Sequence, residues 1–561
     1  GIRGLMAGQG CTMLDTAIIG AGVSGLALAR SLHEQGRSFA LYEARGRFGG
    51  RVLSVQDPSS EHAIDLGPTW YWPDTQPRVA KLVADLGLAN FAQHDEGALL
   101  HLREADKTPE VIEGQKVHNG ARRLEGGMAS LVTALAEALP QQALQLEHVL
   151  VRLQDHDDHV LLTFRVNEAS VEVEARRVVV AIPPRLLLEQ VEFKPSLDEA
   201  TRHAMREAAT WMAAQAKVVI AYAQPHWRAA GRSGNAFVSH DQAVIGEIFD
   251  ACDAGATRAA LGGFLAFAPE QREAFAAGLP MLMASQMAQV FGNALEGGGA
   301  QHYQDWATES FTCSRLDRDA PAADHVDCAN PLLRQAHWDG KLFLGGAETA
   351  ANGGGYIEGA LDAARRIQRA IMRADAAATL TEARSWVAAG LCADAETRNK
   401  ALVAWFGEWV AAQSGFALDG YRQRLNQDLA AQQRDQLTQR AILGSAEDVF
   451  AAALDVLKTL PFDTRGVAVE RGRCTLTPEL QHAFRDFLPT LLDDVIAFNR
   501  TSCALSNFPH EHQPPKEYVQ AMLKDIAAAW QEFSLSANAL LLAKAKGTAG
   551  EAQGAGVGAS Q

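Results

Sequence analysis

Three glycines near the start of the chain are spaced for binding a pyrophosphate. They lie at 20, 22 and 25, after an apolar strand-like run (16–20) and before apolar residues at helical spacing. In such a turn the first glycine permits the bend, the second lets the backbone approach the pyrophosphate, and the third lets the helix pack on the strand. Free amide groups and the dipole at the helix start then favour the phosphates.

An acidic residue follows these glycines at the expected distance. Glu43 ends a second strand-like run, 39–43, about 20 residues after the glycine turn, where a carboxylate can accept hydrogen bonds from an adenosine ribose. Strand, turn, helix, strand and acid in this order predict a βαβ unit that binds a dinucleotide. An ordinary glycine turn does not explain why the three glycines and the acid stand in register.

The residues after Glu43 decide between a nicotinamide and a flavin cofactor. The segments 44–52 and 65–70 resemble the flavin-containing amine oxidase family, which includes monoamine, polyamine and L-amino acid oxidases. Further segments resemble the family in the same order along the chain, namely 126–139, the strand at Val149, 176–184, 216–227, 305–306 and 342–366. The resemblance extends from Met13 to about Asp375, which is about two thirds of the chain.

The resemblance implies that the cofactor is FAD. The positions that match the family's FAD-binding segments are Gly20, Gly22, Val23, Ser24, Gly25, Glu43, Ala44, Arg45, Gly50, Arg51, Gly67, Pro68, Thr69, Trp70, Val149, Trp306, Gly346, Glu348, Tyr356 and Ile357. Arg51 is expected to neutralise the pyrophosphate, and Glu348 to hydrogen-bond the ribityl or pyrophosphate region. Some relatives bond the flavin through a cysteine; this chain has Arg315 at that position and Cys313 two positions earlier, so we predict non-covalent FAD.

Two residues match the family's catalytic positions. Lys217 stands in a strand-like run where the family carries a lysine that reaches flavin N5 through a water, and burial would lower the pKa of this lysine. Tyr356 matches the tyrosine that stands beside the flavin and faces the substrate nitrogen, which an aromatic face attracts. The glycines before Tyr356 suggest a backbone close to the cofactor.

The resemblance implies oxidation of an amine. Hydride passes from the α-carbon to flavin N5, the resulting imine is hydrolysed, and O2 re-oxidises the flavin to give H2O2. Two departures bear on the substrate. The family's amine oxidases usually complete an aromatic cage with a second tyrosine, and that position holds Leu316 here, so the cage is incomplete unless Phe311 or Trp70 substitutes. Trp70 stands where L-amino acid oxidases carry an arginine that binds the substrate carboxylate. An amine without an α-carboxylate is therefore expected.

Other functions stay open from the sequence. An L-amino acid oxidase is one alternative, because an arginine elsewhere could bind a carboxylate, and a flavin amine dehydrogenase that passes electrons to something other than O2 is another. A non-catalytic flavin-binding or redox-sensing protein belongs to a different class, which the presence of both Lys217 and Tyr356 argues against. No metal site is predicted, because His510 and His512 in a proline-rich segment have no third ligand nearby.

The predicted fold class is α/β, with an FAD-binding Rossmann-like domain, an α+β substrate domain and an added C-terminal α-helical domain. The FAD-binding domain takes 13–86, 121–185 and 307–375, the substrate domain 87–120 and 186–306, and the helical domain 376–546. The ends 1–12 and 547–561 are expected to be disordered, since they contain many glycines and little apolar surface.

The helical domain shows several local signals. Ser445 resembles the start of a capping box, Thr477 and Pro478 a helix start, and apolar residues from Leu480 to Phe498 one long helix kinked at Pro489. This domain could cover the substrate cleft and exclude water, or it could be a partner-binding or dimerisation module. The sequence leaves both open, and a homodimer is one expectation.

Composition limits the partners. The 561 residues carry a net charge of −16, which argues against nucleic acid or an anionic membrane as a partner. Seven scattered cysteines form no Cys-x-x-Cys pair, so neither disulfides nor zinc are indicated and a cytoplasmic location is predicted. No apolar run reaches the roughly 20 residues of a membrane helix. The expected partners are a small-molecule amine and O2.

Overall fold

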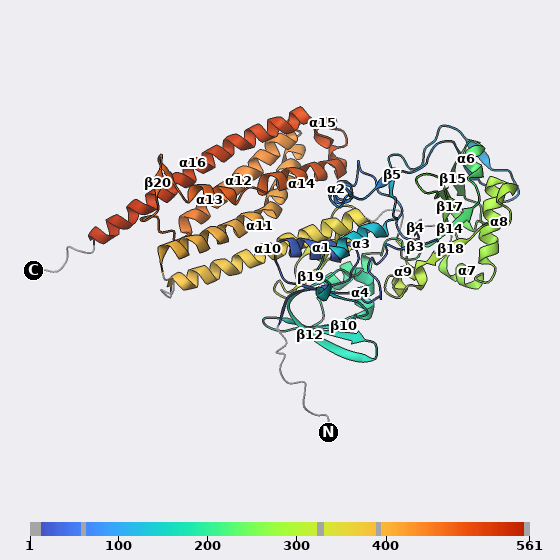
Figure 1. The fold of residues 1–561 in the computed structure, drawn as a ribbon, viewed down its shortest axis with the longest axis horizontal. Coiled ribbons are helices and arrows are strands. Elements are labelled where there is room, and N and C mark those ends of the chain that lie inside the picture. The colour runs from blue at the N-terminus through green and yellow to red at the C-terminus, as the bar shows by residue number, and fades with distance from the viewer. Residues whose placement is uncertain (1–12, 58–62, 323–329, 389–393, 555–561) are drawn as a thin grey trace, which may run out of the picture. The chain divides into compact units, whose positions relative to one another are not determined.

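The computed structural model describes residues 13–57, 63–322, 330–388 and 394–554 (Figure 1). The chain divides into two compact units, Gly1–Arg365 and Arg366–Gln561. The boundary lies within helix α10 (Ile357–Ala388), ten residues before the predicted start of the helical domain. The predicted disordered leader, 1–12, lies outside the described residues.

The first unit contains the predicted βαβ unit at the centre of an eight-stranded sheet. Strand β1 (Leu14–Ile19) pairs in parallel with β2 (Ala40–Tyr42) and with β12 (Ala169–Val180), and α1 (Val23–Glu34) connects β1 to β2. β12 also pairs in parallel with β19 (Leu342–Leu344). Because three distant stretches of chain pair side by side, residues near 20, 180 and 345 meet at one edge of this sheet, where parallel sheets bind their ligands.

The remaining strands of this sheet are β9 (Leu144–Gln145), β10 (Val149–Asp155), β11 (Val160–Val166) and β13 (Glu192–Lys194). β13 pairs with β10, although the sequence placed 186–306 in the substrate domain. The turn after α4 (Pro184–Gln190) thus returns the chain to the first sheet before it leaves, and the boundary at 186 stays a prediction. The other predicted domain boundaries stay predictions.

A second, seven-stranded sheet carries Lys217. Its order is β18 (Gln301–Asp305), β14 (Ala216–Tyr222), β17 (Ala259–Leu265), β16 (Ile245–Asp250), β15 (Arg232–Val238), β6 (Ala98–Leu102) and β7 (Glu110–Ile112). Helix α8 (Leu279–Phe291) contributes Leu279, Met283, Met287 and Val290 to the core of this sheet. Small two-stranded sheets, β3 (Ser54–Gln56) with β4 (Ala63–Asp65) and β5 (Asn90–Ala92) with β8 (Arg122–Leu124), complete the strands of this unit.

The helices of the first unit are short. Besides α1, α4 and α8 they are α2 (Pro77–Asp85), α3 (Ala129–Glu137), α5 (Glu199–Glu207), α6 (His226–Ala229), α7 (Pro269–Ala274) and α9 (Arg315–Asp319). None of the helices in the described part of the chain combines the length and the apolar character needed to cross a membrane.

The second unit is helical, as the sequence predicted, and has its own apolar core. Its helices are α11 (Ala395–Ala430), α12 (Leu437–Thr459), α13 (Thr477–His482), α14 (Phe487–Thr501), α15 (Pro509–His512) and α16 (Lys516–Gly554), with a small hairpin of β20 (Val469–Glu470) and β21 (Arg473–Cys474). α12 lies beside both α11 and α16 (Figure 1). Fully buried side chains such as Phe406, Tyr421 and Leu457 fill the space between these helices.

Two of three local predictions in this unit need correction. Ser445 does not begin a helix: it lies inside α12, where its buried hydroxyl donates a hydrogen bond to the carbonyl of Ala417. The long helix kinked at Pro489 is two helices, because the chain turns after His482 and Pro489 falls in the first turn of α14, where its missing N–H needs no partner. The helix start at Thr477 is confirmed.

The predicted disordered tail is helical through Gly554. Residues 547–554 extend α16, because adding a residue to an existing helix gains a hydrogen bond without the cost of nucleation. The last residues, 555–561, lie outside the described part of the chain.

Candidate active site

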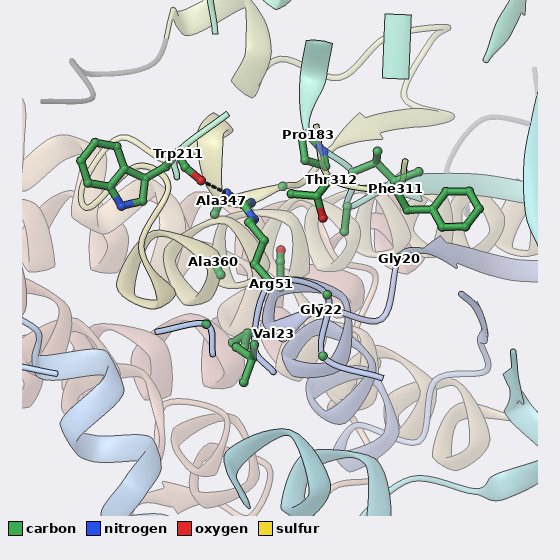
Figure 2. Close-up of a pocket in the computed structure, with 18 of the residues that line it drawn as sticks. Gly20, Gly22, Val23, Arg51, Pro183, Trp211, Phe311, Thr312, Ala347 and Ala360 are labelled. Carbon is green, nitrogen blue, oxygen red and sulfur yellow. Dashed lines mark hydrogen bonds between the residues drawn. The ribbon is translucent and has the colours of Figure 1, made fainter. Parts of the chain in front are cut away.

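A cavity in the first unit gathers nearly all the predicted cofactor and catalytic residues (Figure 2). Every predicted residue lines it except Gly25 and Glu348. The walls come from both sheets: the first sheet contributes the glycine turn and the segment after β19, and the second contributes Lys217 and Phe264. The cavity therefore lies where a ligand bound at the edge of the first sheet would meet the second.

The glycine turn has the geometry expected of a phosphate-binding loop. Gly20 has φ +102°, and a Cβ there would lie 2.5 Å from the carbonyl oxygen of Ala181. Gly25 lies beneath the turn, and a Cβ on it would lie 1.9 Å from the carbonyl oxygen of Gly20. No side chain caps the start of α1, whose N-cap is Gly22. The first amides of this helix therefore face the cavity as donors, which suits a pyrophosphate.

Glu43 lies at the cavity beside this turn, buried and already hydrogen-bonded. Its carboxylate accepts the backbone amides of Ala21 at 2.8 Å and of Arg45 at 2.9 Å. A carboxylate oxygen has lone pairs for more than one donor, so the ribose hydroxyls predicted for Glu43 still have acceptors.

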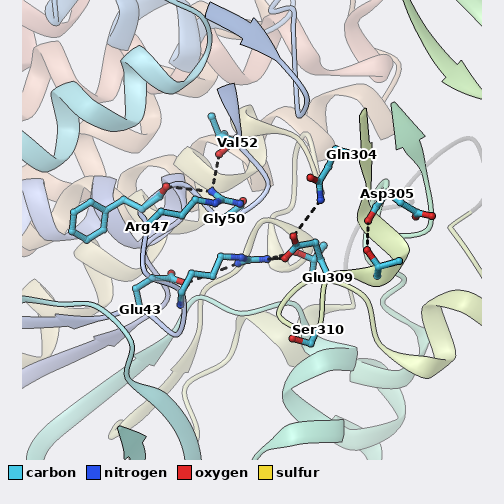
Figure 3. Close-up of polar contacts among 12 residues, drawn as sticks. Glu43, Arg47, Gly50, Val52, Gln304, Asp305, Glu309 and Ser310 are labelled. Atoms are coloured by element: carbon cyan, nitrogen blue, oxygen red, sulfur yellow. Dashed lines mark hydrogen bonds and ion pairs between the residues drawn. The ribbon is translucent and has the colours of Figure 1, made fainter. Parts of the chain in front are cut away.

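Arg45 lies next to Glu43, which is drawn with Glu309 among the polar contacts of Figure 3. Its Nη2 donates to the hydroxyl of Thr312 at 2.6 Å and lies 3.4 Å from a carboxylate oxygen of Glu309. Its Nε is buried and has no hydrogen-bond partner among the described residues. An unsatisfied buried donor at the cavity wall fits a polar ligand such as the adenosine part of FAD.

Arg51 and Glu348 form a bidentate ion pair. The two guanidinium nitrogens donate to the two carboxylate oxygens at 2.8 and 2.9 Å, and Glu348 is only 1% exposed. Burial by itself lowers the pKa of Arg51, but the neighbouring carboxylate outweighs this and raises it. Arg51 lines the cavity, whereas Glu348 lies behind it. The carboxylate of Glu348 binds Arg51, and its predicted contact with FAD stays a prediction.

Lys217 is buried in β14 with its amine directed at the segment after β4. Nζ donates to the carbonyl of Gly67 at 2.7 Å and to the hydroxyl of Thr69. It also lies over the rings of Phe249 and Phe264, at 5.5 and 5.6 Å from their centroids. Burial lowers the pKa of Lys217 to about 7, against the opposing effect of Asp65. The amine can thus change its protonation near neutral pH, as a group that handles water at a reaction centre requires.

Tyr356 is 39% exposed and contacts an aromatic residue that the sequence did not single out. The ring centroids of Tyr356 and Trp211 are 5.3 Å apart, at an interplanar angle of 36°. Trp211 lies in the turn before β14, where the sequence has no periodic pattern. Its closeness in sequence to Lys217 was the one signal that could have identified it as a site residue. Trp72, Gln76, Met212 and Gln215 also line the cavity and were not predicted.

The sequence suggested that Phe311 or Trp70 replaces the missing cage aromatic. Both line the cavity. Trp70 is held in place by stacking on His118, with centroids 4.3 Å apart, and by a 2.9 Å hydrogen bond to Gln93. Leu316, at the position of the second tyrosine, is 37% exposed and does not line the cavity. The aromatic character of the site therefore comes from other segments.

Comparison with known proteins finds family models and relatives that resemble this chain. A family model described as flavin containing amine oxidoreductase matches residues 99–372, and one described as NAD(P)-binding Rossmann-like domain matches 18–86. The chain is 21% identical to amine oxidase [flavin-containing] B of Sus scrofa, over 64% of this chain and 86% of that protein. It is 23% identical to amine oxidase [flavin-containing] of Oncorhynchus mykiss, over 64% and 85%.

Solved structures show the same fold. A putrescine oxidase bound to putrescine matches with a TM-score of 0.54 and 20% identity, over 64% of this chain and 99% of that chain. Cyclohexylamine oxidase from Brevibacterium oxydans IH-35A matches with a TM-score of 0.53 and 19% identity over the same shares. Together with the glycine turn, Lys217 and Tyr356 at one cavity, the family-model and sequence matches support the flavin-containing amine oxidase family and indicate an FAD-dependent amine oxidoreductase.

Proposed function

We propose that the chain is an oxidase of monoamines that carry an apolar body and no α-carboxylate, with non-covalent FAD and O2 as the electron acceptor. The observation that carries this proposal is the charge balance of the cavity wall. Among the described residues, the cavity wall contains two arginines, Arg45 and Arg51, and one lysine, Lys217. Both arginines have a carboxylate partner, Glu309 for Arg45 and Glu348 for Arg51. A substrate carboxylate that bound either arginine would have to displace one of these partners.

The acidic side of the charge balance at the cavity wall disfavours a diamine as the substrate. Glu43 is the acidic residue among the described lining residues, and it lies at the glycine turn, where it is expected to hold the ribose of FAD. A second ammonium group on the substrate would therefore be desolvated without a carboxylate beside it, which is costly. The wall also carries the aromatic rings of Trp70, Phe264 and Tyr356, and the amine of Lys217 lies over the ring of Phe264. An apolar amine body suits that surface better than a charged one.

The residues present fit FAD, which when bound supplies the acceptor for the hydride that leaves the α-carbon of the amine. The start of α1 would hold the pyrophosphate, and Glu43 the ribose. Lys217 would hold a water and exchange protons with it at Nζ, since burial brings its pKa near 7. Tyr356 would orient the substrate nitrogen against its ring face. These roles are proposals that rest on the positions of the side chains around the cavity.

Non-covalent attachment is supported by the residues around Cys313. Arg315, at the attachment position of the family, has a side chain that is 94% exposed. Cys313 does not line the cavity, and burial raises its pKa to about 12, so it stays a thiol. Precipitating the purified protein with acid should release all the yellow chromophore into the supernatant. Colour that stays with the pellet would contradict this proposal.

The proposed function is tested by mixing the yellow protein anaerobically with single amines and following the flavin absorbance. Benzylamine and cyclohexylamine should bleach the flavin, whereas putrescine and L-phenylalanine should do so at least tenfold less efficiently. Bleaching by L-phenylalanine alone would instead support an amino acid oxidase. Peroxide formation in air separates an oxidase from a dehydrogenase, and no bleaching by any amine or amino acid would refute an amine substrate.

The remaining parts of the proposal concern assembly and location. We propose a homodimer, to be tested by light scattering of the purified chain, and a cytoplasmic location, to be tested by cell fractionation. The second rests on the scattered cysteines; Cys252, Cys313, Cys474 and Cys503 are free thiols in the structure.

A further inference from the structure

The turn between α5 and β14 is held by three charged side chains. Residues 210–215 bring the chain to Lys217, and three of their backbone groups bond to ionised side chains. Asp317 accepts the amide of Thr210 at 3.0 Å, Arg51 donates to the carbonyl of Trp211 at 3.2 Å, and Arg272 donates to the carbonyl of Ala214 at 2.8 Å. Hydrogen bonds to charged groups are stronger than those between neutral groups.

Each of these three charges also belongs to an ion pair of its own. The pairs are Arg185 with Asp317 at 3.1 Å, Arg51 with Glu348 at 2.8 Å, and Arg272 with Asp305 at 2.8 Å. In each pair at least one side chain is nearly inaccessible to solvent, because Asp317, Glu348 and Arg272 are exposed by 1 to 3%. The turn is thus anchored at Thr210, Trp211 and Ala214 to side chains that are themselves held in ion pairs.

The backbone of the turn is strained at one position. Met212 has φ +60°, a left-handed conformation that a methionine adopts only when its surroundings impose it. Met212 and its neighbours Trp211 and Gln215 all line the cavity. Strained residues that are held by strong contacts at a cavity wall are typical of positions that a function requires.

The turn presents the ring of Trp211 to Tyr356. Besides the 5.3 Å ring contact, the two segments approach so closely at Gly355 that a Cβ there would lie 2.4 Å from the Cβ of Trp211. Gly355 also has φ +81°. The contact of the two rings therefore depends on the anchored turn on one side and on a glycine on the other.

We propose that Trp211 is a positioning and specificity-determining residue, which fixes the ring of Tyr356 and joins it in one aromatic surface for the amine substrate. This inference rests on the proposed function. It assigns the second aromatic group to the turn 210–215, although the family pattern places it at Leu316. A continuous surface of two rings favours an amine with an aromatic body over an aliphatic amine of similar length.

The test compares Trp211→Ala, Trp211→Phe and Leu316→Ala with the wild type, all loaded with FAD. The measured quantity is the ratio of kcat/KM for benzylamine to kcat/KM for butylamine. Trp211→Ala should lower this ratio about 2- to 12-fold, the range that an aromatic contact contributes. Trp211→Phe should restore most of it. Leu316→Ala is the matched control and should leave the ratio within about twofold of the wild type.

Equal losses on both amines in Trp211→Ala would show a merely structural role and overturn the proposal, as would a changed ratio in Leu316→Ala. A second measurement does not need turnover. Benzyltrimethylammonium has no free electron pair on nitrogen, so it can bind without being oxidised, and its binding is followed through the flavin absorbance. Its Kd should rise in Trp211→Ala and recover in Trp211→Phe. If the wild type oxidises no amine, the proposed function fails; an unchanged Kd overturns the role of Trp211.

Discussion

Replacing Gly355 by alanine tests the close approach on which the Trp211 contact depends. The added methyl group would lie 2.4 Å from the Cβ and 2.9 Å from the Cγ of Trp211, so one segment must shift. Gly340 offers a matched control in the same unit. It has the same φ of +81°, and a Cβ added there meets no atom within 4 Å. Both substitutions impose the same backbone strain, and only Gly355→Ala adds a clash.

The difference between the two variants isolates the clash. The left-handed backbone and the reduced freedom of the unfolded chain affect both equally and cancel. Overpacking of this kind costs about 1–3 kcal/mol. At about 2.1 cal/mol/K of unfolding entropy per residue, the 365-residue first unit would lose roughly 1–4 °C of Tm beyond the loss in Gly340→Ala.

The assay is thermal unfolding of the two variants and the wild type, each with excess FAD, followed by circular dichroism and by flavin fluorescence. Gly355→Ala should also shift the benzylamine to butylamine ratio, because the displaced turn carries Trp211. Gly340→Ala should leave that ratio unchanged. If the two variants have the same Tm, the close packing of Gly355 against Trp211 is refuted, and with it the structural basis for the aromatic surface.

Three further predictions concern stability. Between pH 7 and 10.5 Lys217 keeps its proton in the unfolded chain and loses it in the folded chain. The free energy of unfolding of the wild type, relative to Lys217→Met, should therefore rise by roughly 1.4 kcal/mol per pH unit in urea titrations. A difference that does not change with pH would contradict a lowered pKa. Glu358 caps α2 through the amides of Arg78 and Val79, and burial raises its pKa to about 7. Between pH 4.5 and 7 the folded chain holds the proton, so wild-type stability relative to Glu358→Gln should fall by roughly 1.4 kcal/mol per unit as pH rises. Residues 394–554 expressed alone should unfold cooperatively with a helical spectrum, since their core is internal; a gradual, non-cooperative melt would count against an independent unit.

Structural features that depend on residues close together in the sequence were predicted correctly. The glycine turn and Glu43 lie within one βαβ unit, and the structure confirms strand, helix and strand in that order. Helix boundaries were predicted less well. Ser445 has the residue type of a cap, but it lies inside α12 because its hydroxyl finds a buried carbonyl on α11. Tertiary contacts of this kind override local propensity.

By itself, the sequence determined the dinucleotide-binding unit, the flavin cofactor, and Lys217 and Tyr356 as candidate catalytic residues. The first follows from short-range spacing, and the others are implied by the ordered segments that resemble the flavin-containing amine oxidase family. Only the tertiary structure decided that Arg51 is paired with Glu348, 297 residues away, and that Trp211 lies on Tyr356. Such contacts arise where sheets and turns from distant parts of the chain pack together, and no local pattern records which partner will be adjacent. The aromatic character of the site is therefore a property of the packing.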